Sequence, residues 1–292
     1  MQVLVTGASG WVGSAVVREL LHGGHQVTGL VRSSSGAAAL AAIGAGSVIG
    51  TLDDLALLQQ QAAQADAVIH TAFNHDFTRF AESCAQDQRA IAALGAGLAG
   101  SDKMLLVTSG VAMLAQGRPA TEADIPADLP SYPRRSEAAA RQLAQQGLRA
   151  ATVRLAPSVH GIGDQGFMRI LINLARQTGV SAYLGEGQNC WPAVHREDAA
   201  LLYRLALESG VQQPVYHAID EVGIPFRQIA AAIGQGLGLP VAERGPEHFG
   251  WFAGFAGMHM PTSSAQTSAL LGWTAAAPGL LDDLAMPAYF RP

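Results

Sequence analysis

The chain has 292 residues, of which 49% are hydrophobic and 14% charged, and its formal net charge is −5. This length is typical of one large α/β domain or two closely joined domains, and the apolar content excludes intrinsic disorder. A nucleic-acid binder neutralises phosphates with a basic face, and this acidic chain lacks the surplus of positive charge that such a face requires. We therefore expect no nucleic-acid partner.

The first residues, Met1 to Val5, already have a strand-like pattern, without the basic and apolar regions of a secretory signal. No stretch approaches the roughly 18 uninterrupted apolar residues of a membrane span. Cys84 and Cys190 stand in no metal-ligand spacing, and we interpret both as reduced thiols. We expect a cytoplasmic protein that makes no membrane contact.

Short apolar runs alternate with amphipathic stretches up to about residue 156. The predicted strands lie at 3–6, 26–31, 47–49, 67–71, 103–108 and 150–155, and the predicted helices at 12–22, 35–43, 53–63, 77–99 and 133–146. Strands that read as continuous apolar runs between helices are typical of a parallel sheet covered on both faces. The pattern predicts an α/β fold with a Rossmann-type doubly wound parallel sheet.

The alternation loosens after about residue 157. The elements predicted there are helices at 167–177, 197–208 and 225–237, strands at 181–184 and 215–219, and a closing helix that ends at Leu271-Gly272-Trp273. We predict a dinucleotide-binding domain over residues 1–156 and a smaller C-terminal α+β substrate-binding region over residues 157–292, packed closely on the first domain.

A glycine-rich turn joins the first predicted strand to the first predicted helix. It comprises Gly7, Ser9, Gly10, Trp11, Val12 and Gly13, with the glycines in GxxGxxG spacing. Such glycines allow a tight turn, bring a diphosphate close to the N–H groups of a helix N-terminus, and let the helix lie against the sheet. Because a second strand follows at the required distance, the turn predicts a nucleotide cofactor rather than tight packing alone.

The end of the second predicted strand bears on the choice of cofactor. An Asp or Glu there would bind the ribose diol of NAD(H), but this chain has Arg32 and Ser33. A guanidinium can bind a 2′-phosphate with two hydrogen bonds, and a serine adds a hydroxyl donor. We predict NADP(H), with NAD(H) as the alternative if Arg32 is only a solvated charge.

With these residues, the chain resembles the extended and atypical branches of the short-chain dehydrogenase/reductase superfamily, the NAD(P)-dependent epimerase/dehydratase-like group. The segments 50–54, 68–72, 154–161, 194–198 and 271–273 are similar to further family landmarks, so the resemblance covers nearly the whole chain. It implies additional cofactor contacts from Leu52, Thr71, Ala72, Phe73, Pro157 and Val159. It also implies a homodimer formed through the long helices at 77–99 and 133–146.

The resemblance implies a catalytic Ser or Thr after the fifth strand, which polarises a carbonyl group, and a Tyr that transfers a proton. It also implies a Lys four residues after the Tyr. Ser109 is the candidate hydroxyl, and an alternative register places Gly110 in its slot. Tyr132 is the candidate proton donor, but Ser136 stands in the lysine slot.

No shift of register restores the lysine. Sliding by one residue puts Pro133 in the tyrosine slot and Glu137 in the lysine slot, and the only lysine of the chain, Lys103, lies at the start of the fifth strand. A phenol with a pKa of about 10 can still donate a proton at neutral pH. Tyr132 is therefore either a donor in a modified relay or a loop residue ahead of a helix.

Three further side chains are candidates for that relay. Arg135 would lie near Tyr132 on one helix face if the helix begins around Pro133, where its guanidinium could stabilise a tyrosinate. His75 and His160 are substitute acids or bases, or else structural hydrogen bonders. Separately, Asp87 lies in the region where the atypical members have an Asp in place of the family's Asn, which adds to the resemblance, although a solvated helix face is the commoner explanation for one Asp.

We expect a mainly apolar substrate pocket at the carboxyl ends of the strands. Its predicted residues are Phe73, Asn74, Val111, Met113, His160, Phe167 and Trp191. This lining favours a small or hydrophobic ketone, aldehyde or imine over a sugar nucleotide, whose diphosphate needs positive charge. No His, Cys, Asp or Glu spacing indicates a metal site.

Three hypotheses follow from these residues. The first is an NADP(H)-dependent oxidoreductase that reduces such a carbonyl or imine by hydride transfer, with a proton relay that lacks the lysine. The second is an NAD(P)-dependent epimerase or dehydratase acting on a sugar nucleotide. The third is a non-catalytic protein that senses NADP(H).

Overall fold

The computed structural model describes residues 1–114, 117–127 and 132–291 of the chain. The first six strands are β1 (Gln2–Thr6), β2 (Gln26–Val31), β3 (Gly46–Ile49), β4 (Ala67–His70), β5 (Met104–Gly110) and β6 (Arg149–Leu155). The helices between them are α1 (Trp11–His22), α2 (Ser34–Ala42), α3 (Leu55–Gln64), η1 (Phe77–Arg79), α4 (Phe80–Leu98) and α5 (Ser136–Gln145). The predicted strands of this half are confirmed, with bounds that differ by no more than two residues.

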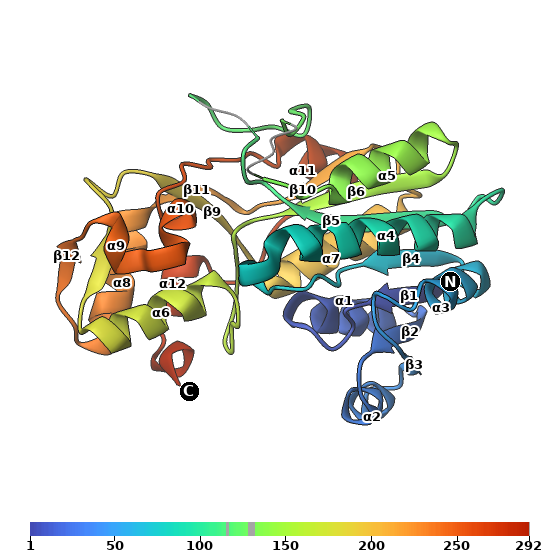
Figure 1. Cartoon of the computed structure of the whole chain (residues 1–292), viewed down its shortest axis with the longest axis horizontal. Coiled ribbons are helices and arrows are strands. Elements are labelled where there is room, and N and C mark those ends of the chain that lie inside the picture. The colour runs from blue at the N-terminus through green and yellow to red at the C-terminus, as the bar shows by residue number, and fades with distance from the viewer. Residues whose placement is uncertain (115–116, 128–131, 292) are drawn as a thin grey trace. The chain divides into compact units, whose positions relative to one another are not determined.

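These strands belong to a seven-stranded sheet (Figure 1). Its order is β10-β6-β5-β4-β1-β2-β3, in which β10 is Val215–Ala218. The pairings of β1 with β2 and β4, of β2 with β3, and of β4 with β5 are all parallel. The strand order changes direction between β1 and β4. The chain therefore has the predicted Rossmann-type sheet, in which ligands bind at the carboxyl ends of the strands beside this switch point.

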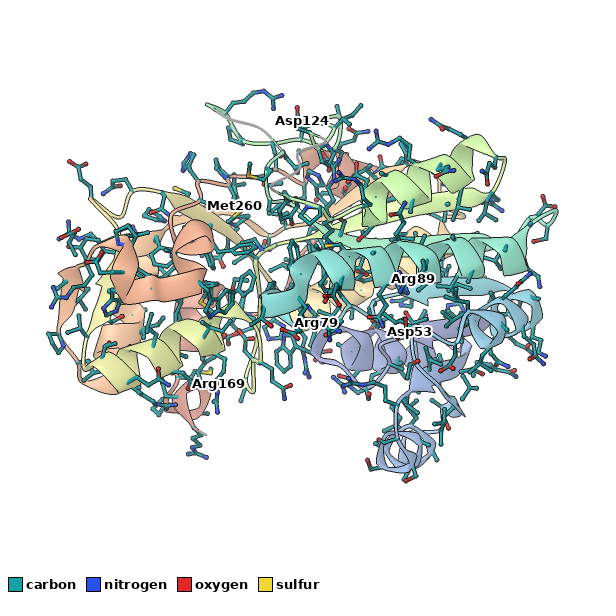
Figure 2. All side chains as sticks on the ribbon, viewed as in Figure 1. Asp53, Arg79, Arg89, Asp124, Arg169 and Met260 are labelled. Atoms are coloured by element: carbon teal, nitrogen blue, oxygen red, sulfur yellow. The ribbon has the colours of Figure 1, made fainter. Side chains whose placement is uncertain are left out.

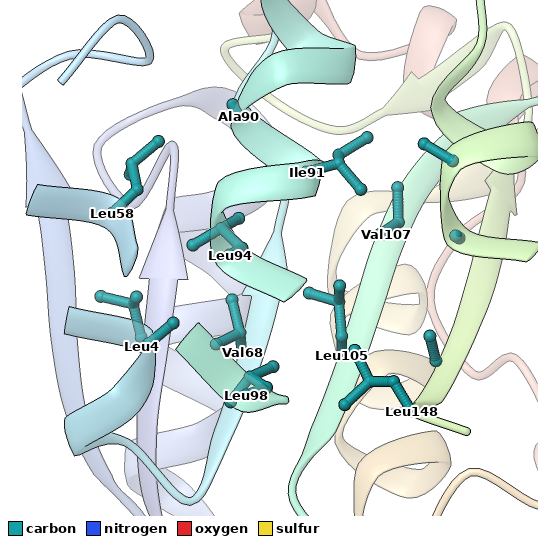
Figure 3. Close-up of a cluster of buried hydrophobic side chains, with 14 of the residues drawn as sticks. Leu4, Leu58, Val68, Ala90, Ile91, Leu94, Leu98, Leu105, Val107 and Leu148 are labelled. Carbon is teal, nitrogen blue, oxygen red and sulfur yellow. The ribbon is translucent and has the colours of Figure 1, made fainter. Parts of the chain in front are cut away.

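One face of the sheet packs against α3, α4 and α5. Leu4, Val68 and Leu105 come from three neighbouring strands, and each is at most 2% exposed. Figure 3 shows them beside Leu94 and Leu98 of α4. Because successive side chains of a strand point to opposite faces, every second residue of these strands faces this core.

The opposite face is covered as well. Arg204 of α7 (Arg196–Glu208) donates from Nε to Glu19 of α1 at 2.7 Å, so these two helices lie side by side. Val3 and Val5 alternate with Leu4 along β1 and are also fully buried. Burial on both faces is the reason why these strands read as continuous apolar runs in the sequence.

The loop before α3 is tied to α4 at the surface. Gln86 donates from Nε2 to Asp53 at 2.6 Å, and Arg89 Nη2 lies 3.4 Å from the other carboxylate oxygen of Asp53. Figure 2 shows Asp53 and Arg89 pointing toward one another. These contacts hold the loop that contains Leu52, one of the predicted cofactor residues.

The chain divides into two compact units. The first comprises residues 1–109, 127–154 and 199–216, and the second comprises residues 110–126, 155–198 and 217–292. The predicted domains have a single boundary after residue 156. In the structure, residues 110–126 belong to the second unit and residues 199–216 belong to the first. The division into a cofactor domain and a substrate region stays a prediction.

The second unit contains two small sheets and several helices. Its strands are β7 (Ser158–His160), β8 (Ser181–Tyr183), β9 (Cys190–His195), β11 (Glu221–Pro225) and β12 (Val241–Glu243), in the orders β11-β9-β7 and β12-β8. Its helices are α6 (Phe167–Thr178), α8 (Phe226–Leu237), α9 (Pro246–Phe249), η2 (Gly250–Phe252), α10 (Ala253–Ala256), α11 (Ala265–Leu271), α12 (Leu280–Leu284) and η3 (Pro287–Phe290). Across the described residues, no helix combines the length and the hydropathy that crossing a membrane requires.

Several predicted elements need correction. The helix predicted at 133–146 begins only at Ser136, because the backbone of the N-cap residue Arg135 is not helical, with a φ of −120° and a ψ of 11°. The helix at Ala265–Leu271 ends as predicted, where Gly272 adopts a φ of 62°, but α12 and η3 follow it, so it does not close the chain. The strands β7, β9, β11 and β12 were not predicted, because no clear alternation marks them.

Candidate functional site

The turn between β1 and α1 is shaped by positions that exclude a side chain. Gly7 has a φ of 69°, and a Cβ atom there would lie 2.8 Å from the backbone nitrogen of Ala72. A Cβ atom on Gly13 would lie only 2.1 Å from the carbonyl oxygen of Gly7. Side chains do not tolerate such approaches to backbone atoms, so the turn requires glycine at both positions.

This turn presents an open helix N-terminus. Gly10 is the N-cap of α1, and among the described residues no side chain caps the helix there. Ser9 and Gly10 are exposed, and Trp11 and Val12 are half-buried. Uncapped N–H groups and the positive end of the helix dipole attract phosphate groups. The turn therefore fits the diphosphate of a dinucleotide.

Arg32 and Ser33 follow β2, and both are exposed. Within the described ranges, no hydrogen bond or ion pair engages the Arg32 side chain. Ser33 is the N-cap of α2, and its Oγ accepts a hydrogen bond from the backbone N–H of Gly36 at 3.2 Å. The Arg32 guanidinium is therefore available to an anion, while the Ser33 hydroxyl is already used in part by the helix.

The chain leaves β4 beside the glycine turn. Thr71 Oγ1 donates to the carbonyl oxygen of Thr6 at 2.7 Å, and the Ala72 N–H donates to Thr6 Oγ1 at 3.3 Å. These bonds fix the exits of β1 and β4 against each other at the switch point, and Phe73 follows directly. Leu52 is half-buried against the core beneath α3 and α4.

The two hydroxyl groups near the end of β5 differ in their partners. Thr108 Oγ1 lies 2.6 Å from the hydroxyl oxygen of Tyr203, whose pKa is raised by complete burial. Ser109 is half-buried, and no described residue hydrogen-bonds to its hydroxyl group. Ser109 thus offers a hydroxyl that has no partner among the described residues. Gly110 follows as the last residue of β5, and the choice between the two registers stays a prediction.

Tyr132 belongs to a group of aromatic rings. Its ring centroid lies 5.9 Å from that of Phe80, which lies 6.1 Å from Phe73. Desolvation raises the pKa of Tyr132, and the nearby charge of Arg134 acts in the opposite direction. Because the net effect is a raised pKa, the phenol keeps its proton at neutral pH and can donate it.

His75 extends this group of rings, edge-on to Phe73 at 5.4 Å. Partial desolvation and the charge of Arg134 lower the pKa of His75, so its imidazole is neutral at pH 7. Asn74 is exposed, and its Oδ1 accepts a hydrogen bond from the backbone N–H of Asp76 at 3.2 Å. His75 can therefore accept a proton at neutral pH, and its catalytic role stays a prediction.

The predicted alignment of Arg135 with Tyr132 is wrong. Because α5 begins at Ser136, Arg135 is the N-cap residue and shares no helix face with the tyrosine. Its Nη1 donates to the backbone carbonyl oxygen of Tyr132 at 3.3 Å. The structure gives this arginine a contact with the backbone of Tyr132, and its role toward the phenol stays a prediction.

Arg134, one residue earlier, makes contacts that the sequence did not suggest. Its Nε donates to Ser136 Oγ at 3.0 Å, and its Nη2 donates to the carbonyl oxygen of Thr108 at 3.3 Å. Its Cζ lies 4.3 Å from the centroid of the Phe73 ring. The guanidinium is thus held at the exits of β4 and β5, among the residues predicted for the site.

Asp87 does not lie on a solvated helix face. It is 1% exposed, its Oδ1 lies 3.0 Å from His70 Nε2, and its Oδ2 accepts a hydrogen bond from Ser136 Oγ at 2.6 Å. The Nδ1 of His70 lies 2.7 Å from Thr6 Oγ1. Burial alone would raise the pKa of Asp87, but its hydrogen bonds and the charge of Arg134 lower it. Asp87 is a buried carboxylate in a polar network.

Glu137, which the shifted register places in the lysine slot, and Lys103, the only lysine of the chain, have other partners. Glu137 is buried and accepts two hydrogen bonds from Arg154, from Nε and Nη2, both at 2.7 Å. Lys103 precedes β5, and its Nζ donates to the carbonyl oxygen of Ala63 at 2.6 Å. Glu137 therefore forms a structural ion pair, and the lysine lies at the amino end of the strand, opposite the ligand-binding edge.

The remaining predicted residues belong to the second unit: Val111, Met113, Pro157, Val159, His160, Phe167 and Trp191. Val111 is buried, whereas Met113 is exposed and has a φ of 62°, which is strained for a side-chain-bearing residue. Pro157 and Val159 flank the start of β7 and are half-buried. Trp191 is completely buried, with its ring 5.9 Å from that of Phe167, so its part in a pocket stays a prediction.

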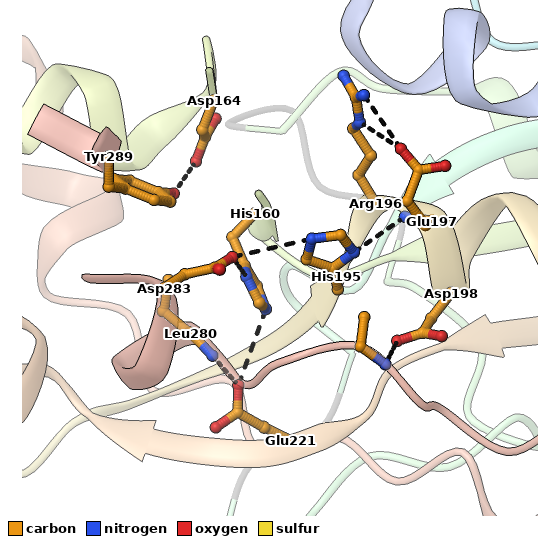
Figure 4. Close-up of polar contacts among 11 residues, drawn as sticks. His160, Asp164, His195, Arg196, Glu197, Asp198, Glu221, Leu280, Asp283 and Tyr289 are labelled. Carbon is orange, nitrogen blue, oxygen red and sulfur yellow. Dashed lines mark hydrogen bonds and ion pairs between the residues drawn. The ribbon is translucent and has the colours of Figure 1, made fainter. Parts of the chain in front are cut away.

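His160 lies in a buried polar group of the second unit (Figure 4). It is 1% exposed, and its Nδ1 lies 2.7 Å from Asp283 Oδ2. His195 Nε2 lies 3.9 Å from the same oxygen, and Glu221 Oε2 lies 3.9 Å from His160 Nε2. Within the described ranges, no three or more His, Cys, Asp and Glu side chains are grouped to hold a metal ion. The His160–Asp283 contact links β7 to α12.

The sequence model of the NAD dependent epimerase/dehydratase family matches residues 3–219. The chain belongs to this family. It is thus a member of the short-chain dehydrogenase/reductase superfamily, in its epimerase/dehydratase branch, as the resemblance predicted. The family depends on a nicotinamide dinucleotide, which agrees with the open glycine turn.

Two relatives and one solved structure illustrate the range of this family. The chain is 48% identical over 297 residues to an uncharacterized protein of Schizosaccharomyces pombe, covering 99% of this chain and 100% of that protein. It is 28% identical over 260 residues to the 2-alkyl-3-oxoalkanoate reductase of Stenotrophomonas maltophilia, covering 84% and 78% of the two chains. The crystal structure of Thermus thermophilus UDP-glucose 4-epimerase in complex with NAD matches with a TM-score of 0.78, covering 99% of each chain at 19% identity. This last match shows the fold alone.

For this family member, sequence reasoning selected the glycine turn as the predicted cofactor site but did not select most of the polar network. Thr6, His70, Ser136 and Arg134 were not selected as site residues, although all four stand in or beside the motifs described above. The available signal was the absence of a lysine, which should direct attention to every cation within two or three residues of Tyr132.

Proposed function

We propose that this family member is an NADP(H)-dependent oxidoreductase that reduces a small or hydrophobic carbonyl or imine. The observation that carries the proposal is the pairing of an open α1 N-terminus with an available arginine at the end of the neighbouring strand β2. The turn residues would hold the diphosphate through their backbone N–H groups, and Arg32 with Ser33 would hold the 2′-phosphate. Leu52 would contact the adenine, and Thr71, Ala72 and Phe73 would border the nicotinamide, while the cofactor contacts of Pro157 and Val159 stay predictions.

The chain's own groups supply a hydrogen bond and a proton. The reduced nicotinamide, when bound, supplies the hydride. Ser109 would donate its free hydroxyl hydrogen to the substrate oxygen, which polarises the carbonyl group. Tyr132 would transfer its phenolic proton to that oxygen as charge develops on it, and the raised pKa of Tyr132 keeps this proton in place at neutral pH.

The surroundings of Tyr132 support an apolar substrate. The rings of Phe73 and Phe77 both adjoin Phe80, with centroids 6.1 and 5.8 Å from it, and Phe80 in turn adjoins the tyrosine. A 28% identical relative is named a 2-alkyl-3-oxoalkanoate reductase, so an alkyl-substituted β-keto acid joins simple ketones in the substrate panel.

The experiment has two stages. Fluorescence titration should show that NADPH binds more tightly than NADH and that Arg32→Ala removes most of this difference, since the variant loses the charged contact with the 2′-phosphate. Incubation with NADPH and the panel of ketones, aldehydes, imines and β-keto acids should then show oxidation of the cofactor by absorbance. Tyr132→Phe should lower kcat by roughly 10²- to 10⁴-fold. Undiminished activity in that variant would remove Tyr132 as the donor.

Two other hypotheses are tested by the same assay. The absent lysine favours a protein that binds NADP(H) without catalysis, and tight NADPH binding with no turnover across the panel would support that function. The family model favours epimerase or dehydratase chemistry, so UDP-glucose and dTDP-glucose are included, with tightly held NAD⁺ after purification as a second sign. The homodimer and the cytoplasmic location stay predictions.

A further inference from the structure

The lysine slot of this protein is built as part of a buried network. Ser136, four residues after Tyr132, is the first residue of α5 and is completely buried. Its hydroxyl hydrogen is donated to Asp87 Oδ2 at 2.6 Å, which leaves the lone pairs of Oγ free to accept. Arg134 Nε donates to that oxygen at 3.0 Å. The serine therefore links a buried carboxylate to a guanidinium.

The carboxylate at the other end of this link is itself fixed. Asp87 meets His70 Nε2 at 3.0 Å, and His70 Nδ1 meets Thr6 Oγ1 at 2.7 Å, with all three side chains buried. Thr6 is the last residue of β1, immediately before the glycine turn. The network therefore runs from the cofactor turn through β4 and α4 to the first residue of α5, and Asp87 has little freedom to move.

Arg134 is held by contacts from three directions. Besides Ser136, its Nη2 donates to the carbonyl oxygen of Thr108 at 3.3 Å, one residue before Ser109, and its Cζ lies 4.3 Å above the Phe73 ring. The Phe73 ring neighbours Phe80 at 6.1 Å, and Phe80 neighbours Tyr132 at 5.9 Å. The guanidinium thus lies against Phe73, the phenol lies beside Phe80, and these two rings adjoin each other.

We propose that Arg134 supplies the positive charge of the proton relay in place of the absent lysine, and that Ser136 and Asp87 are the positioning residues that hold it there. The inference rests on the proposed reduction, and it gives this role to Arg134 in place of the sequence-based candidate Arg135, which donates from Nη1 to the backbone carbonyl oxygens of Tyr132 and Arg134. When Tyr132 gives its phenolic proton to the substrate oxygen, a phenolate remains, and the neighbouring guanidinium stabilises it until solvent returns a proton. The guanidinium itself keeps its protons throughout.

A test of Arg134 must distinguish its effect from those of the other charged and titratable groups around it. They are Asp87 and Cys84 on α4, His70 and His75 at the exit of β4, Tyr203 on α7, and Tyr132 and Arg135 on the segment before α5. Desolvation and the charge of Arg134 both lower the pKa of His75. His75 is therefore a probe of the guanidinium's position that needs neither cofactor nor substrate.

The test compares two adjacent arginines by NMR titration of the histidine rings, with His75 assigned from a His75→Gln spectrum. Arg134→Gln should raise the pKa of His75, Arg134→Lys should leave it close to the native value, and the matched control Arg135→Gln should not move it. Ser136→Ala should reproduce part of the rise, because the released guanidinium swings away from the rings. Labelled tyrosine Cζ resonances should show a parallel rise in the pKa of Tyr132.

Kinetics with NADPH and a ketone of the panel complete the test. Arg134→Gln should lower kcat about 100-fold or more while the NADPH dissociation constant changes less than about threefold, and Arg134→Lys should recover most of the loss. An unchanged His75 pKa in folded Arg134→Gln, or an equal shift in Arg135→Gln, would overturn the assignment of Arg134. If Arg134→Gln does not fold, Ser136→Ala decides: a native His75 pKa and native kcat in that variant would overturn the proposal. If no substrate turns over, the proposed reduction fails, whereas the titration still reports whether Arg134 holds this position.

Discussion

The glycine turn and the lysine slot lie at the same edge of one sheet, but they are built on different principles. In the turn, Gly7 and Gly13 leave no room for a Cβ atom, so the backbone alone makes the predicted cofactor site. In the lysine slot, the side chains of Asp87, Ser136 and Arg134 come from α4, α5 and the loop before it and meet through hydrogen bonds. The turn depends on the absence of side chains, and the slot depends on side chains that hydrogen-bond to one another.

This difference explains how each region can vary. A change in the turn has to move backbone atoms, so few substitutions are compatible with dinucleotide binding. A side-chain network can exchange one cation for another if the supporting partners change with it. A family member can therefore keep its cofactor turn and rebuild its proton relay, and the contacts of Arg134 are consistent with such a rebuilding.

Gly13→Ala should have the largest effect on cofactor binding. The added Cβ would lie 2.1 Å from the carbonyl oxygen of Gly7, so the turn must open and its N–H groups lose their alignment. We expect NADPH to bind at least about 100-fold more weakly, which corresponds to about 3 kcal/mol. Fluorescence titration of the folded variant measures this effect.

The matched control is Gly254→Ala in α10, where a Cβ atom would meet no atom within 4 Å. NADPH affinity in this variant should stay native. Native affinity in Gly13→Ala as well would mean that the turn does not bind the cofactor through its backbone, and the contrast between the two regions would disappear.

The fold could be predicted from the sequence because its signals are local. Apolar runs such as 3–6 and 67–71 mark strands buried on both faces, and the glycine spacing marks a turn that backbone geometry demands. The network could not be predicted, since Asp87 and Ser136 are 49 residues apart and the helix that brings them together begins at Ser136 rather than at Pro133. The sequence-based choice of Arg135 assumed a helix start near Pro133. Because the helix begins three residues later, the contacts that led us to propose Arg134 could not be foreseen.

Asp87→Asn should have the next largest effect, on stability. The carboxylate is 1% exposed and bridges His70 and Ser136, so an amide leaves one partner with a mismatched hydrogen bond. We expect the free energy of unfolding to fall by about 3 kcal/mol at pH 7, measured by urea denaturation. A fall of this size in the free energy of unfolding, caused by one buried group, would confirm that the slot depends on hydrogen bonds between its side chains.

The pH dependence gives this prediction its sign. The folded structure lowers the pKa of Asp87 below its ordinary value, so the stabilisation is complete above about pH 4 and is lost as the pH falls through the lowered folded pKa. The difference between wild type and Asp87→Asn should therefore shrink in acid. Glu82→Gln on the same helix is the control, because Glu82 is 65% exposed and its pair with Arg79 should add little at any pH.

The smallest effects should come from the two hydroxyls at the end of β5, and they separate packing from chemistry. Thr108→Val leaves the buried hydroxyl of Tyr203 without its partner at 2.6 Å, so the free energy of unfolding should fall by about 1 kcal/mol. Ser109→Ala removes a hydroxyl that no described residue bonds, and stability should change by less than about 0.5 kcal/mol. Only Ser109→Ala should lower NADPH-dependent reduction directly, because a side chain without a structural partner is free to bind substrate. If Ser109→Ala destabilised the fold as much as Thr108→Val, Ser109 would belong to the packing of β5, and the register with Gly110 in the catalytic slot would be favoured.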